Sequence, residues 1–306
     1  MLRGRNIHYE GSDRVRGLGA GGIGAMHLLA RRTGLTAAID ASLDLLKVHQ
    51  PYHESDHVLN IAYNVLCGGH CLEDIEIRRN DEGFLDALGT TSIPDPTTAG
   101  DFCRRFDEPA IDSLMEAANE ARVRVWSAQP HEFFEEAIVD ADGTLVETTG
   151  ECKEGMDVNY KKLWGYHPLL VSLANTQEPI FLVNRSGNRP SHEGAAHDLD
   201  RAVDLLRRAG FRRVLLRGDT DFSQTRHLDR WDAQGVRFVF GYDANKKLVG
   251  VANSLADGGW RPLSREPKYT VKTKPRAQPA NVKEQIIVQR EFTNIRLVSE
   301  DLAPCE

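Results

Sequence analysis

The stretch Glu136–Gly150, EAIVDADGTLVETTG, decides the fold. Ala137, Val139 and Ala141 alternate with Ile138 and the two acids Asp140 and Asp142, and a Gly-Thr turn follows. This pattern predicts a β-strand that ends at a carboxylate. Because side chains alternate along a strand, Asp140 and Asp142 share one face, and Asp142 lies nearer the turn, where a ligand can reach it. Two acids on one face repel each other unless a cation lies between them. The pair therefore predicts a divalent ion with oxygen ligands, and two solvated acids at a turn are the alternative.

A second strand is predicted to end in the same way. In Phe211–Phe222, FRRVLLRGDTDF, three apolar residues lead to Asp219, and a helical pattern follows. If the two strands are neighbours in one sheet, Asp142 and Asp219 meet at the carboxyl ends of the strands, where open α/β sheets bind their ligands. Two-metal phosphoryl transfer needs such an acid cluster, because its ions must lie roughly 4 Å apart.

Composition indicates a soluble globular chain with room for two domains. Charged residues make up 27% of the 306, and no apolar run is long enough to cross a membrane. The net charge of −7 hides an asymmetry: residues 1–150 hold 13 Lys and Arg against 25 Asp and Glu, whereas residues 151–306 hold 25 against 20. The second half is basic enough to face a polyanion. Five scattered cysteines and an N-terminus without an apolar core favour a reduced, cytoplasmic protein.

The first part of the chain has helical periodicity. Residues 1–128 are predicted to form an all-helical domain, a candidate DNA-binding module, although no stripe of Arg and Lys marks a recognition helix. Cys67, His70 and Cys71 are zinc-type ligands, but without a second pair nearby, buried thiols are the preferred interpretation. The predicted helices are Ile23–Arg32, Thr36–Lys47, His57–Cys67, Cys71–Arg78, Glu82–Leu88, Thr98–Arg105 and Pro109–Trp126.

The second part alternates strands and helices. Besides the two strands that end at Asp142 and Asp219, strands are predicted at 145–149, 169–174, 180–184 and 236–241, with helices at 192–209 and 223–234. Three antiparallel strands followed by alternating helix and strand is the order of a ribonuclease-H-like mixed sheet with flanking helices, assigned to residues 131–241. Residues 242–306 change character: strand patterns occur at Tyr269–Lys274 and Glu284–Glu291 without a strong helix, which predicts a β-rich, incomplete insertion.

A basic and aromatic segment lies between the predicted strands. In Tyr160–Pro168, YKKLWGYHP, two lysines are mixed with three aromatic residues, a combination that suits phosphate contact and base stacking. A solvated turn above packed aromatic rings is the alternative.

Five motifs in order resemble the DDE transposases of bacterial insertion sequences, in particular the group with a β-rich insertion in a ribonuclease-H-like core. They are Asp142-Gly143-Thr144, Tyr160–Leu170, Gly187-Asn188-Arg189, Arg217–Phe222 and Arg290–Leu297. The resemblance implies cleavage and transfer of DNA strands by in-line phosphoryl transfer. It implies that Asp142 and Asp219 are the first two acids of a triad and bind Mg²⁺, with Mn²⁺ as a substitute, while Asp140 is the alternative first acid.

The same resemblance implies the partners. Duplex DNA, both terminal repeats and target, is expected to contact Tyr160, Lys161, Lys162, Arg189 and Arg217, and the complete enzyme is expected to be a homodimer associated with the nucleoid rather than with a membrane. The third acid of the family is a glutamate on a helix after the insertion, and the chain stops at Glu306. The expectation is therefore a truncated, catalytically impaired transposase, or a DNA-binding remnant without catalysis.

A different family offers the sharpest alternative. Val139–Val146, VDADGTLV, also resembles the signature of haloacid-dehalogenase-type phosphatases, which implies that Asp140 is the nucleophile and Asp142 the general acid. That fold follows its nucleophile with a helical connection and a parallel sheet. The consecutive strands predicted from Leu145 to Asn184 favour the transposase.

Overall fold

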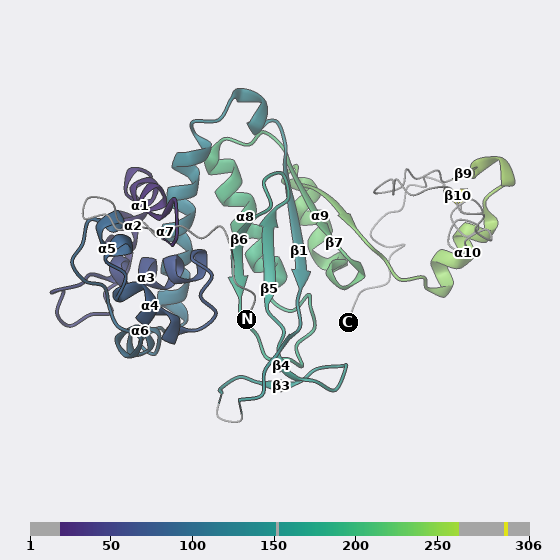
Figure 1. The fold of residues 1–306 in the computed structure, drawn as a ribbon. Coiled ribbons are helices and arrows are strands. Elements are labelled where there is room, and N and C mark those ends of the chain that lie inside the picture. Colours follow the sequence, from purple (N-terminus) through teal and green to yellow (C-terminus); the bar gives the residue numbers. More distant parts are fainter. Residues whose placement is uncertain (1–18, 151–152, 263–290, 293–306) are drawn as a thin grey trace, which may run out of the picture. The chain divides into compact units, whose positions relative to one another are not determined.

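A five-stranded mixed sheet is the largest sheet in the described part of the protein (Figure 1). The structure is a computed structural model that describes residues 19–150, 153–262 and 291–292. The strand order is β6-β5-β1-β7-β8. β1 pairs antiparallel with β5 on one side and parallel with β7 on the other, β5 pairs antiparallel with β6, and β7 pairs parallel with β8. The bounds are β1 Ala137–Gly143, β5 Leu169–Leu173, β6 Glu178–Val183, β7 Val214–Gly218 and β8 Arg237–Phe240. The prediction of an α/β chain with a mixed sheet is confirmed.

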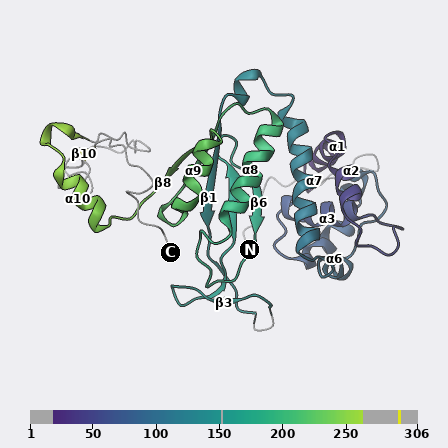
Figure 2. The same cartoon turned by 180° about the vertical axis from the view of Figure 1, so that it is seen from behind.

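One face of this sheet forms the apolar core. Alternate residues of β1, β5 and β7 are almost completely buried, among them Val139, Val171 and Leu216, each 0% exposed. Helices α8 (Ala195–Ala209) and α9 (Thr225–Ala233) lie over the same face (Figures 1 and 2). α8 buries apolar residues at three-to-four spacing, as an amphipathic helix on a sheet does: Ala195, Leu199, Ala202, Val203 and Leu206. The opposite face of β1 carries Ile138, Asp140 and Asp142, which are half-buried or exposed.

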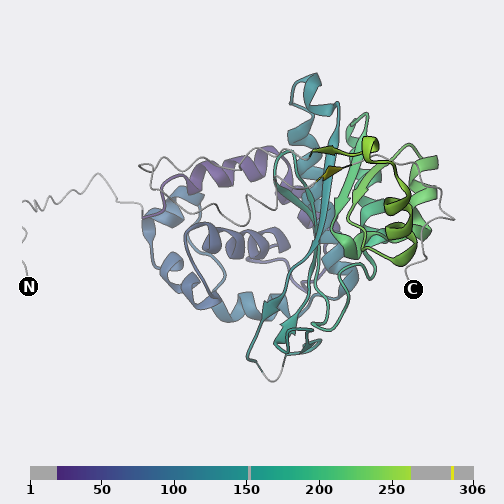
Figure 3. The same ribbon diagram turned by 90° about the vertical axis from the view of Figure 1, so that its right-hand side faces the viewer.

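A small three-stranded sheet extends beyond the carboxyl end of β1 (Figures 1 and 3). Its order is β2-β4-β3, with β2 Val146–Glu147, β3 Asp157–Val158 and β4 Trp164–Tyr166. The predicted strand at 145–149 therefore leaves the main sheet. Gly165 permits the close pairing, because a Cβ at this position would lie 2.0 Å from the carbonyl oxygen of Val146.

In the described residues before β1, all regular secondary structure is helical. α1 and α5 have the predicted bounds, whereas α2 ends at Ser42, five residues early, and α3 begins at Glu54, three residues early. Residue 53 caps α3, and the Asp56 carboxylate accepts the His53 backbone N–H at 2.9 Å. The helices are α1 Ile23–Arg32, α2 Leu35–Ser42, α3 Glu54–Leu66, η1 Leu72–Asp74, α4 Ile75–Arg79, α5 Glu82–Leu88, α6 Pro96–Cys103, α7 Glu108–Trp126 and η2 His131–Phe134.

The residues after β8 differ from the prediction. α10 (Lys246–Ser254) is a helix in a region predicted to have no strong helix, and the Asn245 side chain caps it by accepting the Leu248 N–H at 2.9 Å. Sequence periodicity misses it because Val249, Gly250 and Val251 are weak helix formers. A 3-10 turn (Asp257–Gly259) and the pair β9 (Arg261–Pro262) and β10 (Glu291–Phe292) follow. The predicted strand Tyr269–Lys274, and all of Glu284–Glu291 except its last residue, lie outside the described residues.

The described chain divides into two compact units. One combines the residues up to Glu136 with Asp204–Arg212, and the other combines Ala137–Val203 with the residues from Arg213 onward. The predicted domain limits, 1–128, 131–241 and 242–306, stay a prediction, as does DNA binding by the first of them. No helix in the described ranges combines the length and the apolar character that spanning a membrane requires.

The core assignment predicts a difference between two leucines on neighbouring strands. Leu173 on β5 is 0% exposed and Leu182 on β6 is 55% exposed. Replacing Leu173 with Ala should lower the free energy of unfolding by about 2–5 kcal/mol, because the cavity adds to the lost burial. Leu182→Ala should change it by less than about 0.5 kcal/mol. Urea unfolding followed by circular dichroism measures both, and equal effects would contradict the assignment.

Candidate functional site

The parallel register of β1 and β7 positions the two predicted acids. Asp140 pairs with Arg217, and Asp142 and Asp219 each lie two residues further along their strands. The backbone of Asp219 is still extended, with φ −77° and ψ −165°, so the alternation of side chains continues to this residue. Neighbouring strands are about 4.8 Å apart. Continued by two residues, this register would bring Asp142 and Asp219 to matching positions at the carboxyl ends of the two strands.

Asp140 is engaged in an ion pair. The Arg217 guanidinium donates to both carboxylate oxygens, from Nε to Oδ1 at 2.6 Å and from Nη2 to Oδ2 at 2.8 Å. The hydrogen bond to Asp140 raises the pKa of Arg217, an effect that burial opposes only in part. The predicted contact of Arg217 with DNA stays a prediction, and in this structure its side chain binds Asp140. The two acids of β1 therefore differ in their bonding. Asp140 forms an ion pair with Arg217, whereas no described residue bonds to the carboxylate of Asp142.

Asp219 begins a tight turn. Its Oδ1 accepts the backbone N–H of Asp221 at 3.0 Å and thereby caps the 3-10 helix η3 (Thr220–Phe222). Gly218 allows this turn, because a Cβ there would lie 2.8 Å from the Cβ of Phe222. The bond fixes one oxygen of an exposed carboxylate, and the other oxygen is directed by the same rigid turn.

A cleft of about 800 Å³ at this end of the sheet brings predicted residues together. Asp219, Tyr160, Lys161 and Arg189 all line it, and Asp142 adjoins it through Gly143. Lys162 is not in this group, because it lines another cavity beside Trp164. Arg217 and Asp140 line a third cavity, on the open face of the sheet. The cleft residues are Gly143, Thr144, Leu145, Tyr160, Lys161, His167, Gly187, Asn188, Arg189, Pro190, Ser191, Asp219 and Asp221.

Asn159 organises the loop that carries the basic and aromatic residues. Its buried side chain accepts the N–H groups of Lys161 at 2.8 Å and Leu163 at 3.1 Å. Lys162 adopts a left-handed backbone with φ 63°, which reverses the chain between β3 and β4. Tyr160 is 78% exposed, and the Lys161 ammonium lies 5.5 Å from the centre of its ring. The loop thus presents an aromatic face and a cation together.

Arg185 organises the opposite wall of the cleft. Its guanidinium donates to the carbonyl oxygens of His167 at 3.1 Å, Ser191 at 3.0 Å and Glu193 at 2.7 Å. Burial lowers the pKa of Arg185. The Arg189 side chain forms an ion pair with Glu193 at 2.8 Å, so its charge is partly balanced before any ligand binds. The wall is therefore rigid at Arg185 and charged at Arg189.

Sequence reasoning missed several cleft residues, and His167 is the clearest of them. It is 5% exposed and its Nδ1 donates to the Arg189 carbonyl oxygen at 2.7 Å. A Cβ on Gly143 would lie 2.5 Å from His167 Nε2 and 3.0 Å from Ser191 Oγ, so these groups contact the strand end directly. The signal was present in the Asp-Gly-Thr and Tyr-His-Pro motifs, but nothing in their spacing showed that they meet.

The acid pair suits a hard divalent cation. Asp142 and Asp219 are exposed carboxylates on neighbouring strand ends, and Mg²⁺ and Mn²⁺ take oxygen ligands of this kind. In the described part of the chain, no third carboxylate, His or Cys joins them in a group of three ligands.

Comparisons with known proteins place this geometry in a family. The family described as Transposase DDE domain group 1 matches residues 18–297. A cryo-EM structure of a piggyBac transposase synaptic complex with hairpin DNA is similar over 74% of this chain, with 13% sequence identity and a TM-score of 0.34. The chain spans about half, 52%, of the length of that transposase chain. No curated protein sequence matches. Since the family match covers nearly all of the 306 residues, the chain belongs to the transposases with a DDE domain.

Proposed function

We propose that the chain acts on DNA in transposition by metal-dependent, in-line phosphoryl transfer, with Asp142 and Asp219 as the first two acids of its site. One observation supports this proposal: Asp142 and Asp219 each follow the paired residues Asp140 and Arg217 by two positions, on neighbouring strands of a mixed sheet. Its strand order and directions are those of a ribonuclease-H-like core. Asp142 is the better first acid because Asp140 already binds Arg217.

In this proposal, Asp142 and Asp219 bind the ion, and neighbouring residues hold the walls of the site in position. A divalent ion, when bound by Asp142 and Asp219, would supply Lewis-acid stabilisation of the attacking and leaving oxygens. The turn at Asp221 holds the Asp219 carboxylate in place. His167, buried against the strand end, keeps the Arg189 wall of the cleft in position. We assign Mg²⁺ as the ion, since both ligands are carboxylates.

Duplex DNA is the proposed substrate. The cleft combines a cation and an aromatic face at Lys161 and Tyr160 with a guanidinium at Arg189, which suits a sugar-phosphate backbone next to the acids. The excess of Lys and Arg in residues 151–306 supports the same partner. A bacterial insertion sequence as the source and a homodimer as the working form complete the proposal, on the resemblance of the five motifs.

Two other functions compete with this one. A haloacid-dehalogenase-type phosphatase needs a parallel sheet around its nucleophile strand, whereas β1 is antiparallel to β5 and Asp140 is held by Arg217. A DNA-binding protein without turnover is favoured by a different observation, the lack of a third ligand beside Asp142 and Asp219 in the described ranges. Salt-sensitive DNA binding without strand cleavage would support this second function.

The assignment of the acids predicts the effect of three substitutions on strand cleavage. Asp142→Asn and Asp219→Asn should each reduce Mn²⁺-dependent nicking of duplex DNA that carries the element's terminal repeats, by roughly 10²-fold or more, because each removes charge at the reacting phosphate. Asp140→Asn is the matched control, two residues away on the same face, and should retain most activity.

Gel assays with and without Mn²⁺ measure this directly. Nicking that survives in Asp219→Asn, or that is lost in Asp140→Asn but kept in Asp142→Asn, would show that the acids are wrongly assigned.

The cleft predicts how DNA affinity depends on salt. Lys161→Ala should weaken duplex binding and reduce the slope of log K against log[salt] by about 1, because one phosphate contact is lost. Lys153→Ala is the control, since Lys153 bonds to Thr148 and does not line the cleft. Fluorescence anisotropy over a salt series provides both slopes. Equal slopes for wild type and Lys161→Ala would exclude this lysine from the DNA path.

A further inference from the structure

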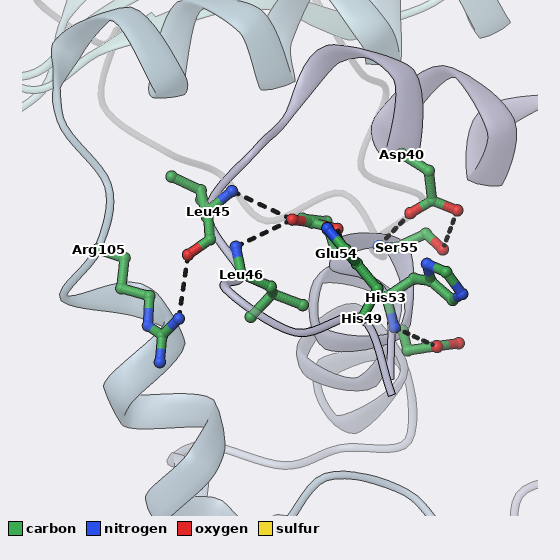
Figure 4. A network of polar contacts seen from close by, with 9 residues as sticks. Asp40, Leu45, Leu46, His49, His53, Glu54, Ser55 and Arg105 are labelled. Carbon is green, nitrogen blue, oxygen red and sulfur yellow. Dashed lines mark hydrogen bonds and ion pairs between the residues drawn. The ribbon is translucent and has the colours of Figure 1, made fainter. Parts of the chain in front are cut away.

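Three metal-ligating side chains meet far from the acid pair in sequence. His49, His53 and Glu54 lie where the loop after α2 enters α3, and one ligand atom of each lies within 4.8 Å of the other two. Figure 4 shows the two imidazoles beside the Glu54 carboxylate. No other group of three His, Cys, Asp or Glu ligands occurs in the described residues, including Cys67, His70 and Cys71. Contrary to the prediction of buried thiols, Cys71 is exposed.

The Glu54 carboxylate is fixed in place. Its residue is 1% exposed, and its Oε1 accepts the backbone N–H groups of Leu45 and Leu46, each at 3.1 Å. Oε2 is left facing His49 Nδ1 at 3.2 Å. The Leu45 carbonyl in turn accepts from Arg105 at 3.0 Å, which supports the peptide that holds the carboxylate. Such outer contacts orient the ligands of a metal site.

Burial alone would raise the pKa of Glu54, but the surrounding donors reverse this effect. The N–H groups of Leu46, Glu54 and Leu45, together with the nearby His49, lower the pKa below its ordinary value.

The distances suit a tetrahedral ion. Two ligand atoms about 2.0–2.1 Å from one Zn²⁺ are about 3.3 Å apart at the tetrahedral angle, close to the 3.2 Å between His49 Nδ1 and Glu54 Oε2. The His49 and His53 rings stack, with centroids 5.7 Å apart and planes at 21°. Both residues are exposed, and an ion can reach them from solvent.

An ion pair between His49 and Glu54 accounts for only two of these groups. It gives no reason for the His53 ring to lie against the first or for its ligand atom to approach the same carboxylate. We propose that His49, His53 and Glu54 bind Zn²⁺, with water in the fourth position. Two imidazoles and one carboxylate select this ion over Mg²⁺, which prefers oxygen ligands. This site is independent of the proposed DNA chemistry.

Zinc at this position would join the loop to the helix. The His49 ligand lies in the loop, whereas Glu54 is the first residue of α3 and His53 caps it. Asp40 at the end of α2 already binds the Ser55 backbone N–H at 2.8 Å and its hydroxyl at 3.0 Å. The ion would connect the loop between α2 and α3 to the start of α3 and stabilise the folded state by mass action.

The test is Zn²⁺ and Co²⁺ binding to the full chain that carries Asp142→Asn and Asp219→Asn, so that the sheet acids contribute nothing. Titration calorimetry should find one Zn²⁺ per chain, and Co²⁺ should give the visible absorption of a tetrahedral site. His49→Ala and His53→Ala should each weaken Zn²⁺ binding at least about tenfold, since even outer-shell changes cost 10–100-fold. Chelation should lower the melting temperature of the parent but not of His53→Ala.

His131→Ala is the control, because His131 is an exposed histidine whose contacts are with Glu135 and Arg212. It should bind Zn²⁺ as the parent does. Circular dichroism checks that the exposed His49 and His53 variants stay folded, which is why the buried Glu54 is not substituted. Unchanged Zn²⁺ affinity in the His49→Ala/His53→Ala double variant, or no uptake by the parent at micromolar Zn²⁺, would overturn the proposal.

Discussion

The parallel hydrogen-bonding register between β1 and β7 is the constraint on which the site depends. It pairs Asp140 with Arg217, and Asp142 and Asp219 each follow two residues later. A slip by one residue would turn the side chains of one strand to the other face, and the apolar core beneath opposes such a slip. Because Val139 and Leu216 are completely buried on that core face, packing on one side of the sheet fixes the position of the acids on the other.

Loops around the strand ends complete the site, and buried polar side chains determine their shape. Asn159 closes the loop that exposes Tyr160 and Lys161, while Arg185 gathers the carbonyl oxygens of the opposite wall. These two residues contribute structure rather than ligand contacts. In binding sites, the side chains that contact the ligand are often held in place by a surrounding layer of hydrogen-bonded residues. Lys161 and Arg189 line this cleft although the net charge of the chain is −7.

Sequence reasoning predicted the strands and the acid pair because alternation and an abrupt end at a carboxylate are local signals. It also found α1 and α5 to the residue, since their apolar spacing is regular. It did not foresee the ion pair between Arg217 and Asp140, because this pair depends on strand order, which a single strand cannot reveal. It missed α10, whose Asn245 cap outweighs a weak helical sequence, and the role of His167, which arises only when two loops meet at Gly143.

The central claim is that the carboxylates of Asp142 and Asp219 bind one shared divalent ion. Mn²⁺ binding to the chain, measured by electron paramagnetic resonance, tests it through a double-mutant cycle on these two residues. To keep the histidine cluster out of the measurement, all four proteins should carry His49→Ala and His53→Ala. The account predicts that either single Asn substitution weakens Mn²⁺ binding about as much as the double substitution does. Independent, additive losses, or no loss at all, would show that the two acids do not act on the same ion.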